Sequence, residues 1–160
     1  MFKINRDLEL GEYRIAEIFP DIPKNALMLE IFGSLWAVES ALAETKVWVA
    51  DISHYMSVDN ADGAITVGVS HLRNATAQVL YLDIIHELVH VQQHRQGRDL
   101  YDLSVAYVDR QTEIDAYALT VREARRLGLS ECEIFDYLSV EWITPEEHRR
   151  LARHLRVEVA

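Results

Sequence analysis

The chain has 160 residues, of which 49% are hydrophobic and 26% charged, and its formal net charge is -10 at pH 7. This length and composition predict one globular domain over residues 1–160, which can bury a core without disulfides. The excess of acidic residues argues against a nucleic-acid partner, because phosphates are bound by basic surfaces.

Cysteine content and hydropathy indicate the compartment. Cys132 is the single cysteine, so it can neither form an internal disulfide nor build a thiolate zinc site. This favours a reducing cytoplasm. The first residues turn polar and acidic before any long apolar run, so we expect no signal peptide. The most apolar stretch, residues 26–43, contains Glu30 and Glu39, and we therefore expect a buried helix there and no membrane partner.

The first half of the chain is expected to contain two helices and then two strands. The spacing of apolar residues predicts helices over 7–19 and roughly 24–44. Residues rich in β-branched and aromatic side chains predict strands over 46–52 and 64–69. Residues 53–63 carry a turn signal and are expected to form a polar loop, with the rim of a cleft as the alternative. The two strands are expected to pair as a hairpin.

The second half is expected to be helical. Asn74 is predicted to cap a central helix that runs from about residue 75 to about residue 95 and is apolar on most sides. A further helix is expected over about 106–127. Capping boxes at Ser130 and Thr144 predict two short helices, the second over 145–155. The predicted fold class is α+β, mostly helical, with a small antiparallel sheet packed on the central helix.

The central helix carries a motif that can bind a metal ion. Residues 81–94 contain the sequence His-Glu-Leu-Val-His at positions 86–90, an HExxH pattern among apolar residues. His86 and His90 are four residues apart and project from one helix face, which allows both imidazoles to bind one Zn²⁺. Glu87 lies beside them and can hold a water molecule. The alternative is an exposed polar stripe on a core helix.

A catalytic zinc site needs a third protein ligand. His94 lies two helical turns from His86, about 12 Å along the axis, and is too far away to share one ion with it. Glu113 is the better candidate, because it lies on the next long helix after a loop, and Ala116 follows it at one turn's spacing. Gln93 is interpreted most simply as part of the helix, with a position at the mouth of a cleft as the alternative.

HExxH followed by a Glu-x-x-Ala helix resembles the gluzincin metallopeptidases, in particular small intracellular types such as ImmA/IrrE-like proteins and minimal gluzincins. The resemblance covers about residues 64–120 and implies a zincin-like fold. It implies that His86, His90 and Glu113 are zinc ligands and that Glu87 is the general base. It also implies that the strand 64–69 is the sheet edge that pairs with an extended peptide substrate.

Two features of the family stay open in this sequence. Several gluzincins carry an Asp four residues after the ligand Glu, where this chain has Tyr117. The alternatives that could support a zinc histidine are a tyrosine hydroxyl, Asp83 and Asp109. Three residues could stabilise the oxyanion, and the sequence does not choose among them: Tyr107, His71 and Tyr55.

The predicted function is zinc-dependent hydrolysis of peptide bonds by a metal-bound water, with Glu87 as the general base. The expected cofactor is Zn²⁺, and the expected partner is a peptide or protein substrate. A second hypothesis is a catalytically weak binding module that docks a protein partner. Intact Glu87 favours catalysis, because a purely structural zinc site does not need it.

Overall fold

The computed structural model describes residues 2–158. The fold is α+β, as predicted, and mostly helical. Contacts within the chain group it into two compact units, Met1–Asp99 and Leu100–Ala160. Among the described residues, no helix has both the length and the apolar character needed to cross a membrane.

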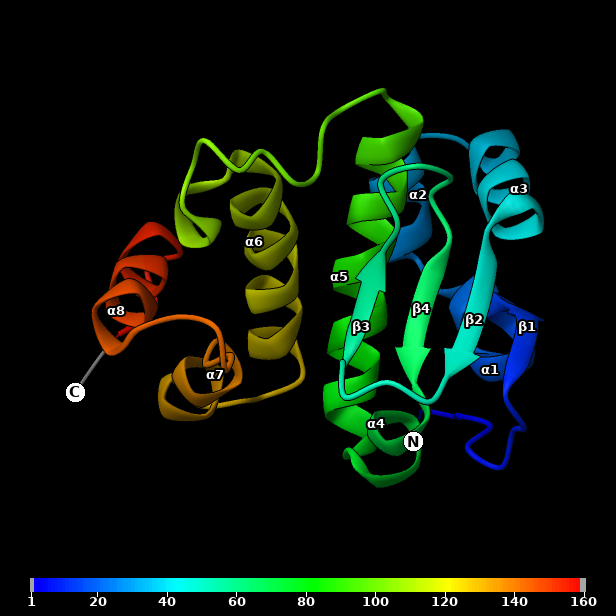
Figure 1. Cartoon of the computed structure of the whole chain (residues 1–160), viewed down its shortest axis with the longest axis horizontal. Coiled ribbons are helices and arrows are strands. Elements are labelled where there is room, and N and C mark those ends of the chain that lie inside the picture. The colour runs from blue at the N-terminus through cyan, green and yellow to red at the C-terminus, as the bar shows by residue number, and fades with distance from the viewer. Residues whose placement is uncertain (1, 159–160) are drawn as a thin grey trace. The chain divides into compact units, whose positions relative to one another are not determined.

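The first unit contains a four-stranded sheet in the order β1-β2-β4-β3 (Figure 1). Its strands are β1 (Gly11–Arg14), β2 (Lys46–Ala50), β3 (Met56–Val58) and β4 (Ile65–Gly68). β2 and β4 run parallel, whereas β1 pairs antiparallel with β2 and β3 with β4. The sheet is therefore mixed, and the prediction of an antiparallel sheet is wrong.

The predicted hairpin between residues 46–52 and 64–69 is also wrong. The turn between them joins β3 to β4, and β3 forms within the segment that was expected to be a polar loop. β4 lies between β2 and β3 in the sheet, so the strand 64–69 is not the edge expected to pair with a peptide. Gly68 permits this arrangement, because a Cβ there would overlap the backbone oxygen of His54.

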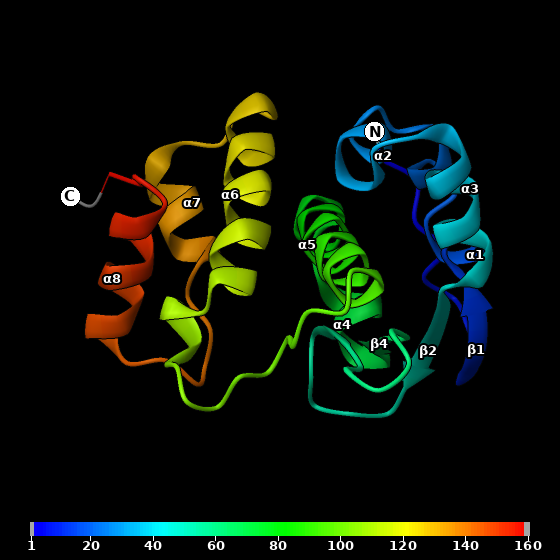
Figure 2. The same cartoon turned by 90° about the horizontal axis from the view of Figure 1, so that it is seen from above.

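Alternation of side chains gives the sheet a buried face and an open one. Val47, Val49, Ile65 and Val67 are buried, whereas Trp48 between them is exposed. This period of two is what a strand with one covered face produces. The covered face packs on the helix α5 (Ala77–Arg95) through β3, and α2 (Leu27–Phe32) contacts the same helix, as Figure 2 shows.

The N-terminal helices differ from the predicted ones. In place of one helix over 7–19, β1 leads directly into the four-residue helix α1 (Ile15–Ile18). In place of one helix over 24–44, a 3₁₀ turn (Ile22–Lys24) precedes α2 and α3 (Leu35–Glu44). Gly33 ends α2 with φ at 85°, a left-handed conformation that glycine adopts readily. The Ser34 side chain then accepts from the backbone N–H of Ala37 and caps α3.

The central helix predicted over about 75–95 is present as α5, but the prediction that Asn74 caps it is wrong, because a short helix that was not predicted precedes it. Asn74 is the last residue of α4 (Val69–Asn74), and the N-cap of α5 is Thr76. The Thr76 hydroxyl accepts a hydrogen bond of 3.1 Å from the backbone N–H of Val79. α5 then continues to Arg95, close to the predicted end.

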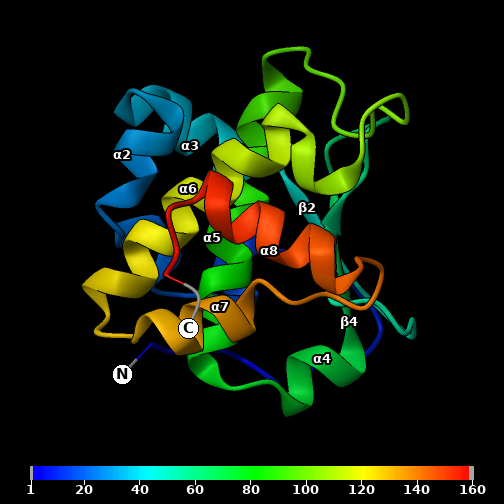
Figure 3. The same cartoon turned by 90° about the vertical axis from the view of Figure 1, so that its left-hand side faces the viewer.

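The second unit is helical (Figure 3). A 3₁₀ turn (Tyr107–Asp109) precedes α6 (Gln111–Arg126), which is followed by α7 (Glu131–Tyr137) and α8 (Pro145–His154). The capping boxes predicted at Ser130 and Thr144 are both present. The Arg125 guanidinium donates to both carboxylate oxygens of Glu131, which links the end of α6 to the start of α7.

Candidate metal centre

The HExxH residues are buried on α5. His86, Glu87 and His90 are 6%, 6% and 5% exposed, respectively. Apolar residues on the other sides of this helix, including Ile85 and Leu88, are also fully covered, so α5 is buried all round at this point. The alternative of an exposed polar stripe is therefore wrong. Ionisable side chains lose favourable hydration when they are buried, so their mutual arrangement has to compensate for the loss.

The two imidazoles face each other across one helical turn. Their Nε2 atoms are 3.0 Å apart and their ring centroids 4.6 Å apart, with an interplanar angle of 81°. Two nitrogens bound to one tetrahedral zinc ion at about 2.0–2.1 Å would be roughly 3.3 Å apart. The pair therefore already has nearly the separation that a shared metal ion requires.

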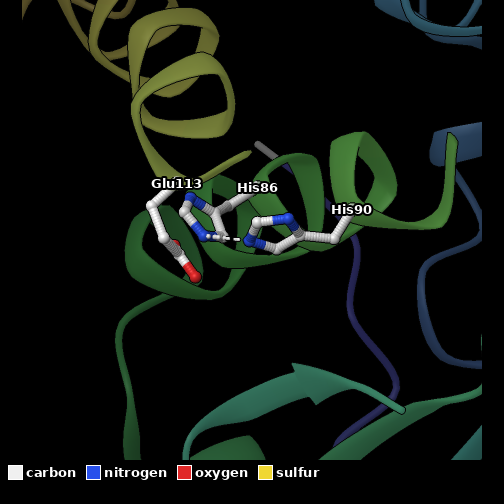
Figure 4. Close-up of side chains that lie close together, drawn as sticks. All are labelled: His86, His90 and Glu113. Carbon is white, nitrogen blue, oxygen red and sulfur yellow. Dashed lines mark hydrogen bonds between the residues drawn. The ribbon is translucent and has the colours of Figure 1, made fainter. Parts of the chain in front are cut away.

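Glu113 completes a group of three possible ligands. It lies in the first turn of α6, and its side chain is buried. One ligand atom from each of His86, His90 and Glu113 lies within 4.8 Å of the other two. The close-up shows the three side chains gathered at one place (Figure 4). Two imidazole nitrogens and one carboxylate oxygen are a donor set that zinc accepts, with a fourth position left for water or substrate. The residues thus lie close enough to hold a metal ion, and their chemistry fits zinc.

Gln93 is a neighbour of this group that the sequence interpretation did not assign to it. Its side chain is 3% exposed, and its Oε1 lies 2.7 Å from the Nδ1 of His90. An amide oxygen only accepts, so the Nδ1–H of His90 donates this hydrogen bond. The i,i+3 spacing on a helix, which brings side chains onto one face, was the signal that could have identified it.

His94 lies outside the group, as helix geometry predicts. Its imidazole packs against Gly63, where a Cβ would lie 2.6 Å from Nδ1. It lines a separate pocket with Glu44, Asp62 and Arg95.

Several residues were alternatives for supporting a zinc histidine or for stabilising the oxyanion, and they contact one another in pairs. His71 Nε2 lies 2.7 Å from an oxygen of Asp83, and the Tyr55 ring lies 5.0 Å from the His71 ring. In the second unit, the hydroxyls of Tyr107 and Tyr117 are 2.9 Å apart. Tyr117 thus hydrogen-bonds a second tyrosine.

Asp109 is engaged in an ion-pair cluster. Arg150 donates to both of its carboxylate oxygens at 2.9 Å, and His154 lies 3.0 Å from one of them. The Arg150 guanidinium, together with the smaller contribution of His154, holds the pKa of the Asp109 carboxyl below its usual range. These contacts account for Asp109 as a link between the 3₁₀ turn and α8.

Fold and site together define an α+β protein with a buried His-His-Glu group that could hold a metal ion. Comparison of the chain with known protein families, with curated proteins and with solved structures gives no match. The resemblance to gluzincins therefore rests on the motif residues alone.

Proposed function

We propose that this protein is a zinc-dependent peptidase. The observation that supports the proposal is the buried group of His86, His90 and Glu113, whose ligand atoms lie within 4.8 Å of one another. A buried Glu87 directly follows the first histidine. A purely structural metal site has no need for this additional carboxylate, whereas hydrolysis needs a base beside the metal.

The residues have separate tasks in this proposal. His86, His90 and Glu113 would hold the ion, and bound zinc would polarise the scissile carbonyl and lower the pKa of water towards about 7. Glu87 would accept a proton from the water molecule as the water oxygen attacks the carbonyl carbon. Glu87 would then deliver that proton to the leaving amine as the C–N bond breaks. The buried surroundings would strengthen these electrostatic interactions, because they exclude bulk water.

The test compares wild-type protein with Glu87→Gln for zinc content and for turnover of a broad peptide library. We expect both proteins to bind one zinc ion, because Glu87 is not among the three proposed ligands. We expect the variant to lose roughly 10²–10⁴-fold in kcat/KM, since it lacks the base. Glu39→Gln, at an exposed position on α3, is the matched control and should keep full activity.

The same experiment distinguishes the second hypothesis. A protein that only docks a partner would bind zinc stoichiometrically, and wild type and Glu87→Gln would be equally inactive on every peptide. That outcome would contradict the proposed peptidase activity and favour a binding module.

A further inference from the structure

We infer that Gln93 is a positioning residue of the metal centre, which fixes the tautomer of His90 and thereby sets the affinity for the metal. The inference rests on the metal site of the proposed function but not on peptide hydrolysis. Gln93 would act through His90 and would contact neither the ion nor the substrate.

The contact is short, buried and local. Gln93 Oε1 lies 2.7 Å from His90 Nδ1, and both side chains are buried on the same helix. The remaining nitrogen of His90, Nε2, faces His86 Nε2 at 3.0 Å. One ring nitrogen of His90 thus contacts the amide, and the other is directed at the proposed ion.

A neutral imidazole carries one proton, on either Nδ1 or Nε2, and only the nitrogen without it can bind a metal. By accepting from Nδ1–H, Gln93 holds the proton on the far side of the ring and leaves the Nε2 lone pair directed at His86. Without this acceptor the proton could occupy Nε2, and the ring could also rotate. Metal binding would then first have to move the proton and reorient the ring.

The chemistry of the amide adds a second consequence. Carboxylates are common partners of metal-bound histidines and make them more basic. Gln93 provides the same acceptor geometry without a charge, so it adds no third carboxylate beside the buried Glu87 and Glu113. Because a glutamate at this position would keep an acceptor oxygen, Gln93→Glu should preserve the orientation of His90. Gln93→Met removes the acceptor at similar size.

Gln92 offers a matched control. It has the same side chain one residue earlier on α5 and is only partly buried. Consecutive helical residues point about 100° apart, so Gln92 cannot replace its neighbour. Gln92→Met should therefore leave the site unchanged.

Two measurements test the inference, and neither uses catalytic activity. The first is ¹⁵N NMR of the histidine rings in metal-free protein, at a pH where they are neutral. We expect His90 of the wild type and Gln92→Met to be protonated on Nδ1, and Gln93→Met to lose this preference. The second is zinc affinity, measured against a competing chelator. We expect Gln93→Met to bind zinc roughly 10–100-fold more weakly, and Gln93→Glu and Gln92→Met to bind within about threefold of the wild type.

Wild-type His90 protonated on Nε2 would overturn the inference, as would unchanged zinc affinity in Gln93→Met. Equal weakening in Gln93→Met and Gln93→Glu would also overturn it, because the role would then be packing. Circular dichroism of each variant identifies a folding defect, and the ¹⁵N NMR of wild-type His90 keeps the test decisive if Gln93→Met does not fold. Failure of the peptidase proposal would appear instead as absent peptide turnover with the wild-type zinc affinity intact.

Discussion

At the scale of single residues, the cost of burying charge dominates the candidate site. Glu87 and Glu113 are both almost fully covered, and moving an isolated carboxylate out of water costs several kcal/mol. A divalent cation held by His86, His90 and Glu113 would offset much of that cost. The affinity for zinc should therefore depend strongly on the carboxylate of Glu113.

This dependence can be measured with Glu113→Gln, which keeps the shape of the side chain but removes its charge. We expect zinc affinity to fall roughly 100-fold or more, because a three-ligand site becomes a two-ligand site. Asp115→Asn is the control, since Asp115 lies two residues away on α6 and accepts from Gln111. Competition with a chelator gives both values. An affinity in Glu113→Gln equal to that of the control would exclude Glu113 as a ligand.

At the scale of elements, an ion pair joins α6 to α7, and both of its members hydrogen-bond the backbone of the C-terminal segment. Arg125 donates to Glu131 and also to the backbone oxygen of Arg156, and Glu131 accepts from the backbone N–H of Glu158. The hydrogen bonds from Arg125, followed by that from Glu158, lower the pKa of the Glu131 carboxyl from 4.5 to about 2. The carboxylate is thus stabilised in the folded protein.

A defined pH dependence follows from the direction of that shift. Because the folded-state pKa is lowered, the stabilisation is present above pH 4.5 and is lost as the pH falls from 4.5 towards about 2. We expect Glu131→Gln to be about 1 kcal/mol less stable than wild type at pH 7, since partial exposure weakens the pair. The difference should shrink towards zero near pH 2.

Urea unfolding of both proteins at several pH values measures this difference. Glu146→Gln, at an exposed position on α8, controls for the general effect of removing one acidic group. A stability difference that stays constant down to pH 2 would contradict the assignment of the effect to the Glu131 carboxylate.

The elements also show what local patterns encode. The helices α5, α6 and α8 and both capping boxes could be predicted, because apolar period and cap residues are local signals. β1 could not be predicted, since its four residues pair with β2 through contacts distant in sequence. The parallel pairing of β2 with β4 likewise depends on where β3 lies, which no turn signal specifies.

In the candidate site, too, some features follow from local sequence and others do not. His86, Glu87 and His90 share one helix, so their proximity follows from helical spacing alone. Gln93 obeys the same spacing, but its partner depends on a rotamer and an amide orientation that the sequence does not reveal. Residue type and a place on the next helix predict Glu113, and its carboxylate lies within 4.8 Å of both histidines.

At the scale of the whole molecule, the proposed zinc ion would be held by residues far apart in the sequence. The most direct test is a crystal structure of the zinc-loaded protein with an anomalous difference map at the zinc edge. We predict one strong peak about 2.0–2.2 Å from Nε2 of His86, Nε2 of His90 and a carboxylate oxygen of Glu113. A zinc peak at another position, or one bound by the histidines without Glu113, would contradict this three-residue zinc site.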